Sequence, residues 1–154
     1  MADYFLDTSA LVKRHVREAG SAWVRSLARP KAGHDLYIAR ITAVEVYSAI
    51  TRRQAGGHLS PAQAGAILGH FRRHLAQRYH VLELTPQLFT EAMFVARKHR
   101  LRAYDAVQLT VAREVDRRNR TAGFGPVTLL SADRDLNTTA TAEGLTVDDP
   151  TAHP

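Results

Sequence analysis

Cysteine is absent from this chain of 154 residues, and its absence removes two classes of structure at once. The protein has no disulfide bonds and no thiolate metal site. The chain also lacks an apolar run long enough to cross a bilayer, so we expect no membrane partner. Asp3 stands where the basic start of a secretory signal would be expected. Together these absences predict a cytoplasmic protein.

Positive charge is what the chain has in excess. Lys and Arg number 21 against 15 Asp and Glu, which gives a formal net charge of +6, and arginine supplies nearly all of the positive side chains. The planar guanidinium group of arginine can bind phosphate with two parallel hydrogen bonds, so this balance favours a polyanionic partner. A soluble protein from an arginine-rich proteome would show the same charge.

Strand and helix patterns alternate along the sequence, without an internal repeat or a low-complexity tract. Short apolar segments predict strands at residues 4–6, 36–39, 80–84, 127–130 and 145–147. Helical spacing and capping residues predict helices at residues 11–16, 21–27, 41–55, from 61, from 86, 103–118 and 136–143. This alternation predicts an α/β fold: one domain over residues 1–148, with a central parallel five-stranded sheet flanked by helices on both faces. Residues 149–154 are expected to be a frayed tail.

Acidic residues follow two of the predicted strands. Asp7 comes directly after the first strand, and Asp133 and Asp135 follow the fourth, just behind Ser131. Sites in open parallel sheets form beyond the carboxyl ends of the strands, so we expect these side chains to lie together. Asp7 has a second interpretation, because an aspartate before a helix can simply cap the free amides there. The same alternative applies to Asp133.

Two further acids lie on helical faces that are otherwise apolar. Glu45 shares its face with Ile41 and Ala49, and Asp105 shares its face with Leu109. Burying an unpaired carboxylate is costly, so an acid in such a position usually has a partner. Asp105 is also explained by its place in the first turn of a helix, where it complements the dipole. A cluster of carboxylates without His or Cys is a hard oxygen site, which suits Mg²⁺ or Mn²⁺.

The order of four segments, FLDTSAL, TAVEVYSAI, LRAYDAVQL and LLSADRDL, closely resembles the PIN-domain ribonucleases, especially the VapC-type toxins of bacterial toxin–antitoxin pairs. The resemblance extends over residues 4–147. The positions that match the family's acidic quartet are Asp7, Glu45, Asp105 and Asp133. Ser9 matches a hydroxyl residue that supports the first acid. Asp135 competes with Asp133 for the fourth position, and the family pattern favours Asp133.

The resemblance implies a PIN-like fold and a metal-dependent endoribonuclease, the toxin of a VapBC-type pair. It implies Mg²⁺ or Mn²⁺ as the cofactor, RNA as the substrate and a cognate antitoxin that blocks the site. We also expect a homodimer. Asp7, Asp105 and Asp133 are then expected to bind the metal directly or through water. Glu45 either completes the metal shell or orients the attacking water, and the resemblance leaves this open. Supporting roles fall to Ser9, Ser131 and Asp135.

Other classes fit the residues less well. A receiver domain needs an acidic doublet near the first strand and a lysine after the last, but Asp7 has no acidic neighbour and LTVDDP has no lysine. A phosphatase of the D-x-D type would have an aspartate at the position of Ser9. The alternative that remains is a degenerate PIN-like or receiver-like domain that binds RNA or protein without catalysis.

Two segments have open roles. The basic residues just before Asp105 either track an RNA backbone or form an ordinary solvated helix end. They are Arg97, Lys98, Arg100 and Arg102. An apolar group at Trp23, Val24 and Leu27 is either part of the core or a surface for a second copy or an antitoxin.

Overall fold

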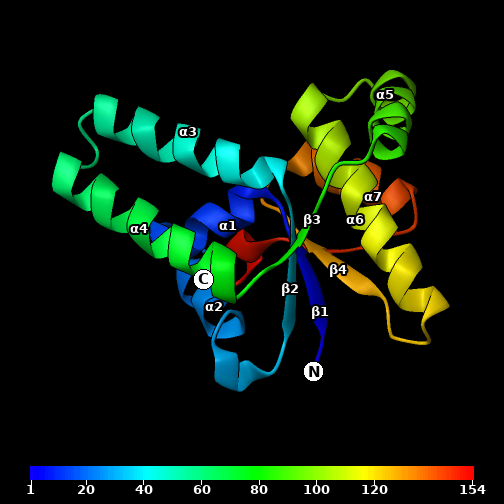
Figure 1. Ribbon diagram of the computed structural model, residues 1–154, viewed down its shortest axis with the longest axis horizontal. Coiled ribbons are helices and arrows are strands. Elements are labelled where there is room, and N and C mark those ends of the chain that lie inside the picture. The colour runs from blue at the N-terminus through cyan, green and yellow to red at the C-terminus, as the bar shows by residue number, and fades with distance from the viewer.

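Five short apolar segments form the strands of a single sheet in the computed structural model, which describes residues 1–154 (Figure 1). All neighbouring strands are parallel, in the order β3-β2-β1-β4-β5. The predicted α/β fold with a parallel five-stranded sheet is confirmed. The strands are β1 (Asp3–Leu6), β2 (Asp35–Ala39), β3 (His80–Leu82), β4 (Val127–Leu130) and β5 (Thr146–Asp148).

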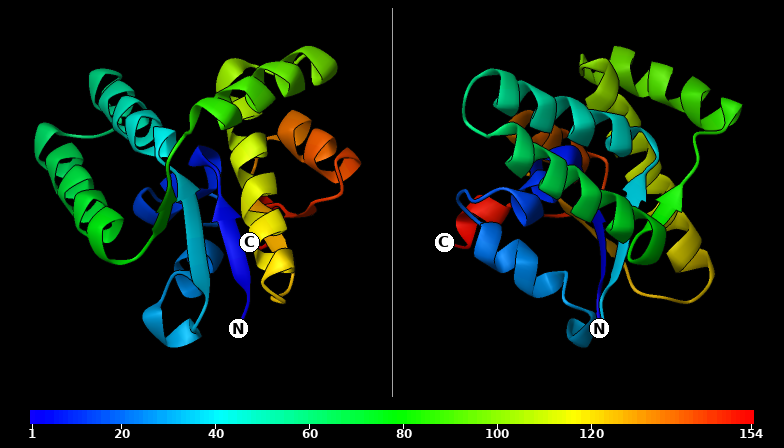
Figure 2. Two further views of the ribbon diagram at one scale, coloured as in Figure 1. Left: turned by 45° about the vertical axis from the view of Figure 1, so that its right-hand side comes forward. Right: turned by 60° about the vertical axis from the view of Figure 1, so that its left-hand side comes forward.

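Helices cover both faces of this sheet, as the turned views of Figure 2 show. One face carries α1 (Thr8–His15), α2 (Ser21–Leu27), α3 (Ile41–Ala55) and α4 (Pro61–Gln77). The other carries α5 (Pro86–His99), α6 (Ala103–Thr121) and α7 (Arg134–Ala142). Two short 3-10 helices, η1 (Pro30–Ala32) and η2 (Pro150–Ala152), complete the chain. None of the helices combines the length and the apolar character needed to cross a membrane.

Each face of the sheet has its own hydrophobic core. Leu11, Ile38 and Phe71 belong to the core under α1–α4, and Leu109 and Leu129 to the core under α5–α7. Successive residues of a strand point to opposite faces, so β4 contributes Leu130 to the first core and Leu129 to the second. Strands buried on both sides explain why the sequence shows apolar runs in place of alternation.

Capping side chains fix where several helices begin. Ser60 accepts from the backbone N–H of Gln63, and the Gln63 side chain accepts from the backbone N–H of Ser60, which makes a complete capping box. Thr85 caps α5 in the simpler way. The first helix begins at Thr8, three residues before its predicted start, because Asp7 caps it. Helix α7 likewise begins early, at Arg134.

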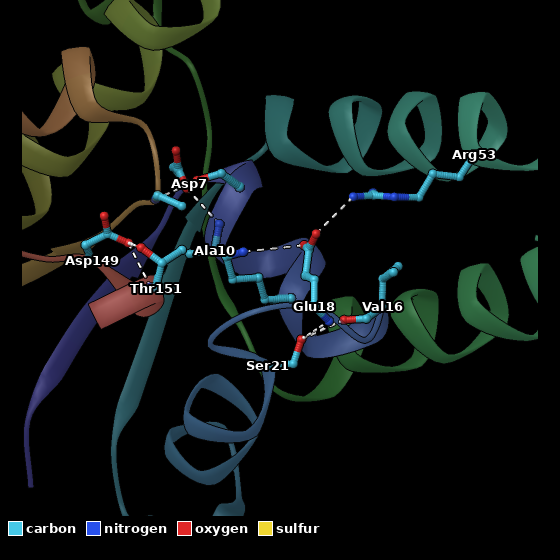
Figure 3. Close-up of polar contacts among 11 residues, drawn as sticks. Asp7, Ala10, Val16, Glu18, Ser21, Arg53, Asp149 and Thr151 are labelled. Atoms are coloured by element: carbon cyan, nitrogen blue, oxygen red, sulfur yellow. Dashed lines mark hydrogen bonds and ion pairs between the residues drawn. The ribbon is translucent and has the colours of Figure 1, made fainter. Parts of the chain in front are cut away.

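Pro150 and His153 hold the last six residues against the domain, which corrects the expectation of a frayed tail. Pro150 is buried, and the His153 ring stacks on Trp23 with ring centroids 3.9 Å apart. At Gly20, where φ is 83°, a Cβ atom would lie 2.3 Å from the Pro150 carbonyl oxygen. Figure 3 shows Asp149 accepting from Thr151 in the same turn. The sequence showed no sign of this packing, because the residues that the tail contacts lie more than a hundred positions earlier in the chain.

The packing of the tail also shows how the apolar residues of α2 are buried. Val24 is fully buried, and Trp23 and Leu27 pack against the same core. Trp23 and Leu27 are partly buried, and His153 covers one face of the Trp23 ring.

Candidate functional site

The chain connections that follow the two central strands, β1 and β4, run to opposite sides of the sheet. This leaves a crevice at the carboxyl ends of these strands. From β1 the chain continues to β2 and β3 on one side, whereas β4 is followed by β5 on the other. Ligands of open α/β sheets bind at such a switch point, beyond the carboxyl ends of the strands. Asp7 directly follows β1, and Ser131 and Asp133 follow β4. The fold therefore brings together acids that lie 126 positions apart in the sequence.

A pocket of about 370 Å³ opens at this crevice. Four predicted acids line it: Asp7, Glu45, Asp105 and Asp133. They come from four different places, namely the cap of α1, the middle of α3, the first turn of α6 and the cap of α7. Asp135 is exposed, and it lines only a neighbouring pocket. The structure thus places Asp133, and not Asp135, beside Asp7.

Asp7 is both a helix cap and a wall of the pocket. Its side chain is 4% exposed. Oδ1 accepts from the Ala10 backbone N–H at 2.9 Å, the capping bond drawn in Figure 3, and from the Ser9 hydroxyl at 2.6 Å. Oδ2 accepts from the Ser131 hydroxyl at 2.8 Å. The two interpretations of Asp7 describe the same side chain.

Both serines connect Asp7 to the loop that follows β4. Ser9 Oγ accepts from the backbone N–H of Ala132 at 2.9 Å, and Ser131 Oγ accepts from the backbone N–H of Asp133 at 3.0 Å. Each hydroxyl therefore donates to Asp7 and accepts from a backbone N–H of the loop that follows β4. This arrangement fixes the distance between the ends of β1 and β4, and with it the spacing of Asp7 and Asp133.

Burial and mutual repulsion disfavour negative charge in the pocket. Burial raises the pKa of Asp7 to about 6, although three hydrogen bonds oppose the shift. Burial also raises the pKa of Asp105, and the charge of Asp133 adds to this effect, while Arg102 opposes it. Carboxylates that repel in this way hold a proton or a cation.

Gln108 orients Glu45, and sequence reasoning did not single it out. Its side chain is 2% exposed, and Nε2 donates to Glu45 Oε1 at 2.9 Å and to Thr42 Oγ1 at 2.8 Å. Gln108 Oε1 is buried without a donor. One signal was present in the sequence: Gln108 lies three residues after Asp105, so both share one face of α6.

A second group missed by sequence reasoning lines the rim of the pocket. Lys13 is only 7% exposed and pairs with Glu18 Oε1 at 3.6 Å, and Arg53 pairs with Glu18 Oε2 at 3.4 Å. Figure 3 shows Glu18 reaching toward Arg53 of α3. No local pattern predicts this group, because it depends on how α1 lies against α3.

The donors of the pocket fit a hard divalent cation. No three His, Asp or Glu side chains stand close enough together to enclose a metal ion by themselves. Mg²⁺ does not require such a cage, since it keeps several waters and is held by one or two carboxylates. The unpaired Oε1 of Gln108 is an acceptor that a hydrated cation can satisfy. The chemistry of the residues and the pKa of Asp7 are both consistent with such an ion.

The largest pocket, of about 810 Å³, lies away from these acids along α6. Its charged side chains are already engaged: Glu114 binds Arg117 and Arg118, and Asp116 binds Arg120. Size alone therefore does not make this pocket the better candidate, and its charged residues on α6 form a solvated face.

Comparison with known proteins agrees with this geometry. The sequence profile of the PIN domain matches residues 4–142. No curated protein matches the sequence. Similar solved structures include PAE2754 from Pyrobaculum aerophilum, with 23% identity, a TM-score of 0.64, and coverage of 98% of this chain and 91% of that one.

Two further similar structures are VapC20 and VapBC2. VapC20 from Mycobacterium tuberculosis, described as a sarcin–ricin loop cleaving toxin, has 18% identity, a TM-score of 0.62, and coverage of 93% and 96%. VapBC2 from Rickettsia felis, bound to a DNA fragment from its promoter, has 12% identity, a TM-score of 0.62, and coverage of 96% and 98%. At these identities the likeness shows the fold, whereas the profile spans all four acids of the pocket. The chain therefore belongs to the PIN domain family.

Proposed function

We propose that the protein is an endoribonuclease that hydrolyses phosphodiester bonds in RNA with Mg²⁺ or Mn²⁺ in the acid pocket. Proteins of the PIN family are nucleases, which supports hydrolysis of this kind. The observation that carries the proposal is the meeting of four carboxylates from four elements at the switch point of the sheet, in a chain of charge +6.

The chemistry follows from the donor set. A bound divalent cation supplies charge that relieves the repulsion among the acids, and Lewis acidity that lowers the pKa of water and polarises the phosphate. Asp7, Asp105 and Asp133 present the oxygens that hold it. Ser9 and Ser131 keep Asp7 in place.

Glu45 has a separate part in this proposal. Gln108 holds one of its oxygens, Oε1, and leaves the other to the pocket. With that oxygen Glu45 either completes the set of cation ligands or accepts a proton from the attacking water.

The protein acts, in this proposal, as the toxin of a VapBC-type pair. VapC20 is described as a sarcin–ricin loop cleaving toxin, VapBC2 is bound to a DNA fragment from its promoter, and both share the fold of this chain. The cognate antitoxin is expected from a small open reading frame immediately before the gene. Co-expression of its product should suppress RNA cleavage and restore growth. A homodimer is expected as well, and sedimentation of the purified protein tests it.

Cleavage of mixed cellular RNA tests the nuclease directly. We expect cleavage with Mg²⁺ or Mn²⁺ and none in excess chelator. The variant Asp133→Asn keeps the cap of α7, because asparagine caps about as well as aspartate, but it should lose nearly all activity. Asp149→Asn is the matched control, since it also changes a capping aspartate but lies outside the pocket.

Two outcomes would contradict the proposal. Equal cleavage in excess chelator would remove the metal mechanism. RNA binding without cleavage under all metal conditions would make the protein a degenerate, non-catalytic PIN domain.

A further inference from the structure

A second pocket, of about 330 Å³, lies beside the acid pocket and shares Asp105 and Asp133 with it. Its other walls come from the turn between α5 and α6 and from α7. Three arginines line it: Arg100, Arg102 and Arg134. A hollow with three arginines on its wall therefore adjoins the place where we propose that RNA is cut.

The guanidinium groups of these arginines are free of the protein. Arginines that pair with a carboxylate in the structure are Arg40, Arg53, Arg113, Arg117, Arg118 and Arg120. Arg100, Arg102 and Arg134 are in none of these pairs, and all three are exposed. Lys98, from the same basic run, is already bound to Glu143 at 2.9 Å. In this basic run, Lys98 is therefore paired with a carboxylate, whereas the guanidinium groups of Arg100 and Arg102 remain available to a ligand.

Arg100 is held in a backbone conformation that favours glycine. It ends α5 with φ 55° and ψ 35°, and it is the only residue other than glycine with a positive φ. Glycine or asparagine usually takes such a position, because other side chains are strained there. Strain of this kind gathers at functional sites. Glycine would adopt this backbone conformation with less strain than arginine does. The presence of arginine therefore indicates that its side chain has a role other than folding.

We infer that Arg100, Arg102 and Arg134 bind a phosphate of the RNA strand next to the phosphodiester that is cleaved. Guanidinium groups bind phosphate oxygens with paired, charge-assisted hydrogen bonds. Asp105 and Asp133 form the wall between the two pockets, so a strand that is cut in one continues into the other. The inference rests on the proposed function and gives the path of its substrate, over the α5–α6 turn and the start of α7.

A different role for the arginines predicts a different result. Asp105, Asp133 and Asp135 also line this pocket. In the alternative role, the arginines only balance the negative charge of these acids. Loss of one arginine would in that case change the affinity of the acids for a cation. In the phosphate-binding role it changes the affinity for RNA and leaves cation binding unaltered.

The variant Arg100→Gly separates these roles and also relieves the backbone strain. We would measure binding of a fluorescent RNA oligonucleotide in excess chelator at several salt concentrations, so that no cleavage intervenes. Affinity at low salt should fall about five- to tenfold, and the slope of log affinity against log salt should decrease by about one. The melting temperature should be equal or higher. Arg100→Asn, which also tolerates this conformation, should repeat the loss.

The matched control is Arg97→Ala, which removes one positive charge from the same helix but outside the pocket. It should lower RNA affinity much less than Arg100→Gly. Equal effects of the two variants, or unchanged affinity in Arg100→Gly, would overturn the inference. So would stronger Mn²⁺ binding, measured separately without chelator, together with intact RNA binding. Because RNA binding is measured in chelator, it does not depend on cleavage. A wild-type protein that fails to cleave RNA would therefore count against the proposed function, while the comparison of RNA affinities would still test the phosphate-binding role of Arg100.

Discussion

Ser131 donates its hydroxyl proton to Oδ2 of Asp7 across 2.8 Å, although 124 positions separate the two residues. The same hydroxyl accepts from the backbone N–H of Asp133, and Ser131 is fully buried. One buried serine therefore sets the position of the first acid relative to the fourth. This link acts together with the hydrogen bond from Ala132 to Ser9 and with the pairing of β1 and β4, which join the same two segments.

Replacing Ser131 with alanine should weaken the metal site without abolishing it. Asp7 Oδ2 would lose its only donor, and partners of metal ligands typically contribute about ten- to a hundredfold to metal affinity or activity. We expect Ser131→Ala to need more Mg²⁺ for half-maximal cleavage. Ser48→Ala, at an exposed serine of α3, is the control. An unchanged Mg²⁺ requirement in Ser131→Ala would show that Asp7 is held well enough without it.

Gln108→Leu should lower the rate of cleavage while the fold remains stable. The change removes the donor to Glu45, so that carboxylate loses its orientation. It also removes a buried oxygen that has no donor, which offsets the lost hydrogen bonds in the free energy of unfolding. Cleavage rate at saturating RNA and melting temperature are the two measurements. Full activity would mean that Glu45 needs no orientation.

The choice between Asp133 and Asp135 has a simple test. Asp133 lines the pocket with Asp7, whereas Asp135 lies on the exposed first turn of α7. Asp133→Asn should therefore reduce cleavage far more than Asp135→Asn. Rates of RNA cleavage by the two variants under identical Mg²⁺ decide the matter, and the reverse order would make Asp135 the fourth acid.

Acid should destabilise the protein through a buried histidine. Burial lowers the pKa of His15 to about 3, and the charges of Arg14, His74, His70 and Arg25 act in the same direction. Between the unfolded value of 6.5 and the folded value of about 3, the unfolded chain binds one more proton than the folded one. The free energy of unfolding therefore falls as pH decreases through this window, by about 1.4 kcal/mol per pH unit for one proton.

His15→Leu removes this contribution. Urea unfolding near pH 7 and near pH 5 should show a smaller loss of stability on acidification in the variant than in the wild type. A residual loss is expected from His74, whose pKa burial lowers to about 4. The same pH dependence in both proteins would mean that His15 is protonated in the folded state.

The parts of the site that the sequence predicted are those with a local signature. Asp7 ends an apolar strand, and Glu45 and Asp105 interrupt apolar helical faces, so each can be recognised from its neighbours in the chain. Strand order adds Asp133, because the ends of parallel strands share an edge. The fold class followed from the alternation of strands and helices for the same reason.

Contacts between elements could not be predicted in this way. The pairing of Lys13 and Arg53 with Glu18 depends on the position of α1 against α3. The stacking of His153 on Trp23 depends on where the end of the chain returns to α2. Both are set by packing of the whole domain, which no short segment of the sequence encodes.

Replacement of Asp7 by asparagine tests whether the acid pocket holds the catalytic cation, with RNA cleavage and metal-free melting recorded on the same preparations. Asparagine preserves the cap of α1, so the fold is retained. It removes a buried carboxylate whose pKa is raised to about 6, so above that pH the metal-free protein should be as stable as the wild type or more so. Each kcal/mol gained would raise the melting temperature by about 2–4 °C.

Catalysis should respond in the opposite sense, because the cation loses a negative donor where the metal-assisted activation of water needs one. We expect a fall in cleavage by orders of magnitude together with an unchanged or higher melting temperature in chelator. Full cleavage by Asp7→Asn would contradict it, and Asp7 would then be a helix cap and nothing more.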